Sequence, residues 1–139
     1  MDTQKDANTF NASLSELEAI RKFIASAAEK LHVEKSAMED LQMAADEAVT
    51  NIIQHGYGSK PGKITIVISR TGDEFFVSII DDAPPFDIFS RKKSDLKISP
   101  LEREKPGGYG VDLIYQLTDR IEQNILENGQ NELSLIKSI

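Results

Sequence analysis

The chain has 139 residues, the size of one domain, and its 16 basic and 23 acidic residues give a net charge of −7. This charge argues against non-specific binding to nucleic acid or an anionic membrane, and the absence of cysteine excludes disulfides and thiolate metal sites. The N-terminus lacks the pattern of a signal peptide, and no apolar run approaches the roughly 18 residues that span a bilayer, so we expect a soluble cytoplasmic protein.

The first part of the chain predicts a flexible start followed by a helix. Residues 1–8 are polar, and we expect them to be flexible, with a short edge strand within Phe10–Leu14. Over Leu14–Leu31, apolar residues recur at intervals of three and four, which is the spacing of an amphipathic helix. Ser13 followed by Glu16 matches a capping box, which predicts that the helix begins there.

A second helix is predicted from about Glu34 to Gln54. Its apolar stripe consists of Met38, Leu41, Ala45, Ala48 and Ile52. Gly56 and Gly58 follow, and we expect these glycines to end the helix.

The rest of the sequence predicts two β-hairpins separated by a long polar segment and a short helix. The predicted elements are strands Lys63–Arg70 and Glu74–Ile80, the polar segment Asp81–Pro106, a helix Val111–Leu117, and strands Arg120–Leu126 and Glu132–Ile136. The turn sequences Thr-Gly-Asp and Glu-Asn-Gly-Gln join the strands of each pair. Short turns make neighbouring strands antiparallel, so we expect an α+β fold. It would be a two-layer α/β sandwich with helices on one face of a mostly antiparallel sheet, in one domain covering 1–139.

The second predicted helix carries a polar stripe that suits a metal-bound nucleotide. Glu47, Asn51 and His55 are spaced by four and therefore share one face. An amide oxygen is a hard neutral ligand that suits magnesium, and a carboxylate one turn away could accept a proton from a hydroxyl group. Taken alone, the stripe is more typical of a solvated polar face.

An acidic segment directly follows an apolar strand. In the sequence DDAPPFD, which begins at Asp81, the first carboxylate could accept a hydrogen bond from an exocyclic amine such as that of adenine. The small residues after it would let a flat base approach the backbone. An ordinary acidic turn containing proline explains the pattern equally well.

A glycine cluster precedes the last predicted helix. Backbone N–H groups at Gly107, Gly108 and Gly110 could point at phosphate oxygens, and a helix N-terminus adds partial positive charge. The Walker pattern is absent, and a flexible loop is the alternative. Residues 88–106 carry six basic and three acidic side chains, a net charge of +3, which suits a mobile lid over polyphosphate or an ordinary solvated loop.

The order of these motifs resembles the GHKL ATPase and kinase superfamily, which has the Bergerat (histidine-kinase-like ATPase) fold. The segment DEAVTNIIQHGYG is similar to its N box, and EAVTN followed by HGY resembles the anti-sigma-factor serine/threonine kinases of the RsbW and SpoIIAB type. DDAPPFD resembles the first glycine box, D-x-G-x-P-F-D, and PGGYGVDLIYQLTD resembles the second glycine box with its helix. The resemblance extends from about residue 10 to the end of the sequence.

The resemblance implies roles for the matching residues. Asn51 would bind Mg²⁺, Glu47 would be the catalytic base that activates a protein hydroxyl, and Asp81 would read the adenine amine. The other nucleotide-binding residues would be Ala83, Phe86, Gly107, Gly108, Tyr109 and Gly110, and residues 82–106 would form the ATP lid.

Two positions depart from the family pattern. Ala83 stands where the first box usually has glycine, which matters for nucleotide binding if the backbone requires a positive φ. A family threonine in one of the last strands, which helps to hold adenine through water, has no obvious equivalent. Asn131 and Ser134 are the candidates to replace it.

The resemblance implies an ATP-dependent, Mg²⁺-dependent serine/threonine protein kinase that is also an anti-sigma factor. Its substrate would be a STAS-domain anti-anti-sigma protein, its other partners a sigma factor and a second copy of itself, and no direct contact with nucleic acid or membrane is expected. The sequence does not fit a sensor histidine kinase, because neither of its two histidines precedes a catalytic domain. The main alternative is an ATP-binding partner-switch module without kinase activity, which Ala83 favours. A purely structural interaction domain, which binds no nucleotide, is the third reading.

Overall fold

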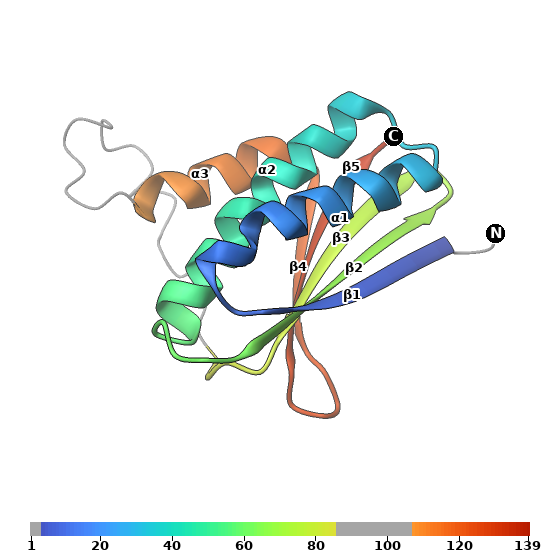
Figure 1. Cartoon of the computed structure of the whole chain (residues 1–139). Coiled ribbons are helices and arrows are strands. Elements are labelled where there is room, and N and C mark those ends of the chain that lie inside the picture. Colours follow the sequence, from blue (N-terminus) through green and yellow to red (C-terminus); the bar gives the residue numbers. More distant parts are fainter. Residues whose placement is uncertain (1–3, 86–106) are drawn as a thin grey trace.

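The computed structural model of the chain describes residues 4–85 and 107–139, with the backbone alone for 107–110. In chain order the elements are β1 (Gln4–Asn11), a 3₁₀ turn (Leu14–Glu16), α1 (Leu17–Lys30), α2 (Lys35–Asn51), a π-helical turn (Ile52–Gly56), β2 (Lys63–Thr71), β3 (Glu74–Asp81), α3 (Gly107–Leu117), β4 (Arg120–Ile125) and β5 (Asn131–Ser138). Figure 1 shows them as two layers, a twisted sheet and a layer of helices.

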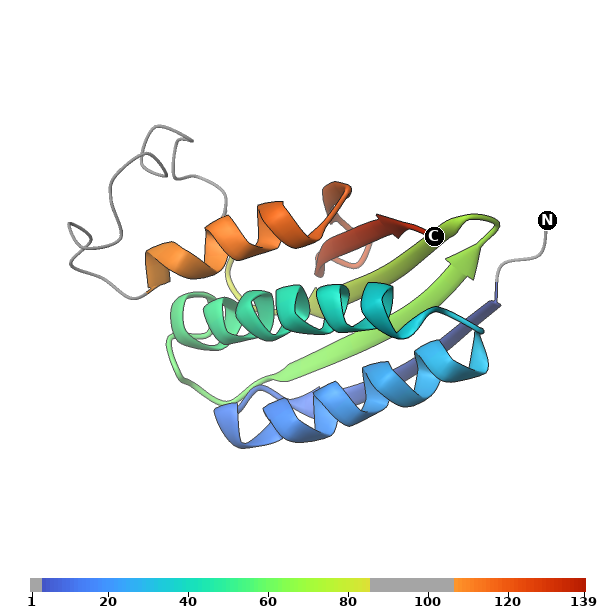
Figure 2. The same cartoon turned by 90° about the horizontal axis from the view of Figure 1, so that it is seen from above.

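The described strands form one sheet in the order β1-β2-β3-β5-β4, and every neighbouring pair is antiparallel. The three α-helices lie on one face of this sheet, and α2 packs between α1 and α3 (Figure 2). The α+β class and the two-layer sandwich predicted from the sequence are therefore confirmed, and the sheet is antiparallel throughout its described part.

The core lies between the sheet and α2. Alternate residues of the two central strands point toward the helices and are fully buried, namely Ile64, Ile66 and Ile68 of β2 and Phe75, Val77 and Ile79 of β3. The facing stripe of α2 includes Leu41, Ala45 and Ala48, which are also fully buried and which the sequence predicted. The small alanine side chains let α2 lie close to the sheet, and this fixes the position of its polar C-terminal half.

The predicted flexibility of the N-terminus was wrong for residues 4–8, and residues 1–3 lie outside the described part of the chain. Strand β1 begins at Gln4, and its eight residues pair with β2 from Gln4 opposite Arg70 to Asn11 opposite Lys63. Residues 4–8 are therefore part of the sheet, although their side chains are polar and mostly exposed. Backbone hydrogen bonds to a neighbouring strand do not depend on side-chain polarity, so the hydrophobic pattern did not indicate this strand.

Helix boundaries also differ from the predicted ones. The Oγ of Ser13 accepts a hydrogen bond from the N–H of Ser15 at 3.4 Å, and it caps a 3₁₀ turn rather than α1 itself. The second helix is α-helical only as far as Asn51 and then widens into the π-helical turn. The third begins at Gly107, four residues earlier than predicted, so the glycines form its first turn instead of a preceding loop.

None of the helices in the described part of the chain is both long enough and apolar enough to cross a lipid bilayer.

Candidate nucleotide-binding site

Three elements that carry predicted site residues meet at one end of the molecule. The C-terminal end of α2 and the first turn of α3 lie side by side at this end of the helical layer, and β3 ends beneath them (Figures 1 and 2). The two helices pack against each other, and Val111 and Ile114 of α3 are buried.

Asn51 is the last residue of α2 and is only 8% exposed. Its Nδ2 donates a hydrogen bond to the backbone carbonyl of Glu47 at 3.0 Å. This bond holds the side-chain amide against the helix backbone, and the amide also carries an oxygen. Such an oxygen is a ligand that Mg²⁺ accepts.

The donor set of the site fits a magnesium ion carried by a nucleotide. Among the described residues, no group of three or more His, Cys, Asp or Glu side chains is placed to hold a metal ion. A cation held by the amide oxygen of Asn51 would take its other ligands from phosphate oxygens and water, which is how Mg²⁺ commonly binds with nucleotides.

Glu47 lies one helical turn before Asn51 and is half-buried. Burial raises the pKa of its carboxyl group, and the nearby charge of Asp46 raises it further. Asp46 itself forms an ion pair with Nη1 of Arg21 on α1, at 2.8 Å. A carboxylate with a raised pKa is a stronger base, so Glu47 is suited to accept a proton.

The π-helical turn after Asn51 changes the direction of the chain. The N–H of Tyr57 donates to the carbonyl of Ile52 at 2.8 Å, a spacing of five residues. Gly58 then has a φ of +61°, which ends the helical path. His55 lies in this turn and is exposed.

Tyr57 connects this turn to both central strands. Its hydroxyl donates to the carbonyl of Lys63 at the start of β2 and accepts a hydrogen bond from the N–H of Asp82, just after β3, at 2.9 Å. The ring leaves no room for a side chain at Gly62, where a Cβ would lie 2.3 Å from Cε1 of Tyr57. Although Tyr57 is part of the HGY motif, sequence reasoning gave it no role. The signal available was a tyrosine next to a helix end, followed by a glycine directly before a strand.

Asp81 is the last residue of β3 and is 5% exposed. Its Oδ1 accepts two hydrogen bonds of 2.9 Å, one from the N–H of Ala83 and one from Nδ2 of Asn131. Burial raises the pKa of Asp81, these two hydrogen bonds oppose that effect, and the charge of Asp82 adds to it. The described ion pairs include none with Asp81, so its negative charge is held by neutral donors.

The structure distinguishes between the two candidates for the missing threonine. Asn131 lies directly opposite Asp81 in the β3–β5 pair and contacts it. Ser134 shares its hydrogen bond with Ser78, at 2.9 Å, on the other face of the sheet. Asn131 is therefore the residue that the structure brings to Asp81.

The alanine in the first glycine box does not strain the backbone. Ala83 is buried, and among the described residues other than glycine only His32 and Ser59 have a positive φ. Its position therefore does not require glycine for conformational reasons.

The second glycine box supplies a helix N-terminus. Gly107, Gly108, Tyr109 and Gly110 form the backbone of the first turn of α3. The first four N–H groups of an α-helix lack acceptors within the helix, so they can bind an anion. Phe86 and the rest of the predicted lid from residue 86 to 106 lie outside the described residues.

The chain is similar to known proteins over most of its length. The family model described as a histidine kinase-like ATPase domain matches residues 10–137. Serine-protein kinase RsbW from Bacillus mycoides (strain KBAB4) is 36% identical over 109 residues, which are 74% of this chain and 66% of the relative. RsbW from Bacillus cereus (strain G9842) matches at 36% with the same coverage. The chain thus spans about two thirds of the length of these curated relatives.

Two solved structures share the fold. A crystal structure of the RsbU and RsbW domains of a Mycobacterium tuberculosis protein aligns with a TM-score of 0.65 and 17% identity, covering 97% of this chain and 32% of that one. The SiaB–SiaC complex from Pseudomonas aeruginosa aligns with a TM-score of 0.60 and 18% identity, covering 93% of this chain and 88% of that one. With the family match over residues 10–137, these findings show that the chain belongs to the family of histidine kinase-like ATPase domains.

Proposed function

We propose that the chain is an ATP-dependent serine/threonine protein kinase and anti-sigma factor that phosphorylates a STAS-domain anti-anti-sigma protein in a partner-switching circuit. The observation that carries the proposal is the pair Glu47 and Asn51, one turn apart at the end of α2. The pair lies beside the first turn of α3, and the buried Asp81 ends the strand beneath. The similarity to RsbW serine-protein kinases supports it.

Each of these residues has a defined task in nucleotide binding. Asp81 accepts a hydrogen bond from the exocyclic amine of adenine, and the N–H groups of the first turn of α3 bind phosphate oxygens. Asn51 would hold Mg²⁺ through its amide oxygen, and the bound ion would neutralise charge that develops on the phosphates. Positioning and charge neutralisation of this kind account for most of the catalysis in phosphoryl transfer.

Glu47 acts on the protein substrate. It accepts the proton of the Ser or Thr hydroxyl while the hydroxyl oxygen forms a bond to the γ-phosphorus and the bond to the bridging oxygen of ADP breaks. The raised pKa of Glu47 makes the carboxylate a better proton acceptor, and its partial exposure lets a protein hydroxyl approach.

The substitution Glu47→Gln tests this assignment, because it keeps the shape of the side chain and removes the base. We expect phosphate transfer from labelled ATP to a purified STAS partner to fall by about 10²–10⁴-fold, with ATP affinity changed by less than about 3-fold. Titration calorimetry with ATP and Mg²⁺ gives the affinity. Equal transfer rates for the two proteins would refute the role of Glu47 as base.

An ATP-binding module without transferase activity is the second candidate. Its support in the sequence was Ala83, but the backbone there does not need glycine, which removes the conformational reason to expect weak nucleotide binding. Tight binding of ATP without transfer to any STAS partner would favour the module over the kinase. No thermal shift with ATP and Mg²⁺ would favour the structural domain over both, since a ligand that binds the folded state stabilises it.

Two associations complete the proposal, a homodimer and a complex with a sigma factor. Both rest on the resemblance to anti-sigma-factor kinases. Sedimentation of the full chain tests the dimer, and co-elution with a candidate sigma factor tests the complex. A monomer at all concentrations, or separate elution, would refute the corresponding association.

A further inference from the structure

A side chain from the last strand holds the turn that follows β3. Asn131 lies opposite Asp81 in the β3–β5 pair. Its Nδ2 donates to Oδ1 of Asp81 and to the backbone carbonyl of Ala83, each at 2.9 Å. Because an amide nitrogen carries two hydrogens, both donors of Asn131 are used on this one turn.

These bonds make the two oxygens of Asp81 unequal. Within the described part of the chain, the N–H of Ala83 and the amide of Asn131 both donate to Oδ1. A carboxylate can accept on both oxygens, so Oδ2 is the atom left for a ligand. The rotation of the carboxylate is also fixed, because two donors from different directions meet the same oxygen.

The amide also affects the charge of the site. Burial disfavours the ionised form of Asp81, and the hydrogen bond from Asn131 acts in the opposite direction. An ionised carboxylate accepts a hydrogen bond from a 6-amino purine and repels the carbonyl of a 6-oxo purine. A protonated one can donate to that carbonyl, so loss of ionisation weakens the distinction between the two bases.

We propose that Asn131 is a positioning residue for base selection, which orients Asp81 so that Oδ2 receives the exocyclic amine of adenine. The proposal rests on the nucleotide site proposed above, but it assigns a task to a residue outside the three matched motifs. Asn131 acts through Asp81 and need not touch the nucleotide.

The test compares Asn131→Ala and Asn131→Asp with the control Asn124→Ala in the full chain. Asn124 lies on the same hairpin, opposite Glu132, and is exposed. The dissociation constants of ATP and ITP, each with Mg²⁺, are measured over a range of pH for every protein. The titration of the Asp81 carboxyl is followed by NMR in the free protein, which needs no ligand.

We expect Asn131→Ala to weaken ATP binding by about 10-fold, the usual effect of losing a hydrogen bond to a charged group, and ITP binding by less than about 3-fold. Asn131→Asp places a second carboxylate beside Asp81 and should reduce the ratio of ATP affinity to ITP affinity further. In both variants the pKa of Asp81 rises, so ATP affinity is lost at a higher pH than in the wild type. Asn124→Ala should match the wild type in all three measurements.

Two results would overturn the proposal. One is an equal loss of ATP and ITP affinity in Asn131→Ala, which indicates general distortion rather than base selection. The other is an unchanged titration of Asp81 in that variant. If the wild-type protein binds neither ATP nor ITP, the proposed function itself fails, and the role of Asn131 fails with it. The nucleotide-binding measurements on the wild type identify that case separately.

Discussion

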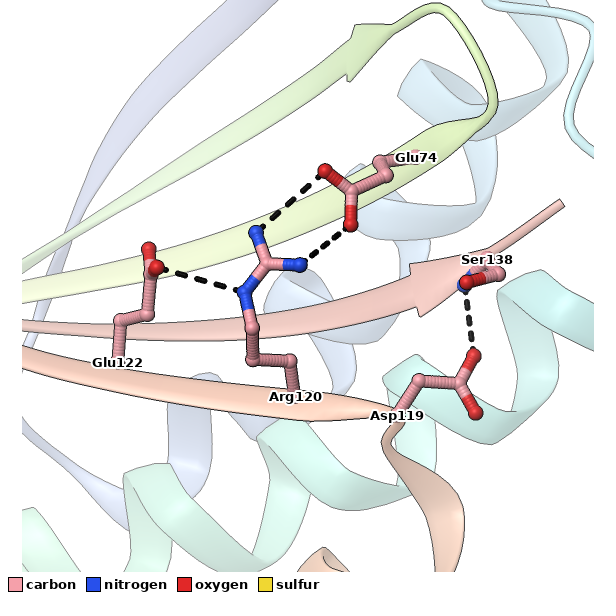
Figure 3. Close-up of polar contacts among 5 residues, drawn as sticks. All are labelled: Glu74, Asp119, Arg120, Glu122 and Ser138. Atoms are coloured by element: carbon pink, nitrogen blue, oxygen red, sulfur yellow. Dashed lines mark hydrogen bonds and ion pairs between the residues drawn. The ribbon is translucent and has the colours of Figure 1, made fainter.

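The two ends of β3 carry acidic residues in opposite environments. At the start of the strand, Glu74 is paired with the guanidinium of Arg120, with N–O distances of 2.6 and 3.4 Å, and Arg120 also contacts Glu122 at 3.4 Å (Figure 3). At the other end, Asp81 is 5% exposed and is held only by neutral donors among the described contacts. The two side chains lie on opposite faces of the sheet, since alternate residues face alternate sides.

This contrast separates an acid that has a cationic partner from the acid that we propose binds a ligand. Glu74 is partly exposed and has a cationic partner, so a ligand would have to displace Arg120 to bind it. Asp81 is desolvated and has no cationic partner among the described residues, which is unfavourable for the free protein. Groups in such a state are concentrated at functional sites, where a ligand supplies the missing partner.

The largest expected effect comes from removing the charge at the buried end. Asp81→Asn keeps an oxygen for the two donors but removes the acceptor charge for the adenine amine. We expect ATP affinity to fall by about 100-fold, as for loss of a charged hydrogen bond in a desolvated site. Glu74→Gln is the matched control and should bind ATP as the wild type does. Titration calorimetry measures both, and similar losses in the two variants would contradict the comparison.

The contacts that Tyr57 makes with Lys63 and Asp82 can be disturbed by a substitution at Gly62. A Cβ at Gly62 would lie 2.3 Å from the ring of Tyr57, so Gly62→Ala must displace a ring that is held at its hydroxyl by Lys63 and Asp82. Overpacking of this kind costs about 1–3 kcal/mol in the free energy of unfolding. Denaturant unfolding measures it. In a Tyr57→Ala background, Gly62→Ala should lower the free energy of unfolding by clearly less. An equal loss in both backgrounds would contradict the proposed clash.

A smaller change at the same place is Tyr57→Phe, which keeps the ring and removes the hydroxyl. The variant leaves the N–H of Asp82 without this acceptor, and we expect a loss of about 1 kcal/mol in stability. The amide hydrogen of Asp82 should exchange faster with solvent, as measured by NMR in the free protein. Unchanged exchange would show that Tyr57 does not hold this turn.

The pH dependence of stability tests the burial of Asp81. Burial raises the pKa of Asp81 in the folded chain above its ordinary value of 3.8, so the folded state takes up a proton at a higher pH than the unfolded state. At neutral pH we expect Asp81→Asn to be more stable than the wild type. As the pH falls through the raised pKa toward 3.8, the wild type regains stability and the difference disappears. Chemical unfolding at several pH values checks this, and a pH-independent difference would contradict it.

The smallest effect is expected at the exposed end of the strand. Arg120→Ala removes the ion pairs with Glu74 and Glu122, whose side chains are 36% and 48% exposed. Exposed pairs of this kind contribute little to stability, because solvent screens them. Thermal unfolding should show a small shift, with ATP affinity unchanged. A large loss of affinity would mean that the two ends of β3 are coupled.

The parts of the fold that depend on local sequence were predictable. The hairpins were found because turn residues lie between apolar strands, and α2 was found from its repeating apolar positions. Strand β1 was not fully found, because its pairing with β2 is a contact between distant residues and its side chains carry no apolar alternation before Phe10. The first turn of α3 was missed because glycine is a poor helix former, and the packing of α3 against α2 overrides that preference.

The candidate site was predictable only in part, for the same reason. Glu47 and Asn51 share a helix face that can be read from their spacing, and Asp81 stands at the end of an apolar strand. The contacts of Tyr57 with Asp82 and of Asn131 with Asp81 join residues 25 and 50 positions apart. No local pattern encodes such contacts. The chemical roles of all these residues stay predictions until nucleotide binding is measured.

The strand order has a consequence for how the protein is made. Strand β5 lies between β3 and β4, although it comes last in the sequence. During synthesis β1, β2 and β3 emerge first with α1 and α2, and they leave the edge of β3 unpaired until β5 follows. Asp81 lies on that edge and meets Asn131 only when β5 has docked. The proposed adenine end of the site is therefore completed only after β5, the last strand in the sequence, has been synthesised and has paired with β3.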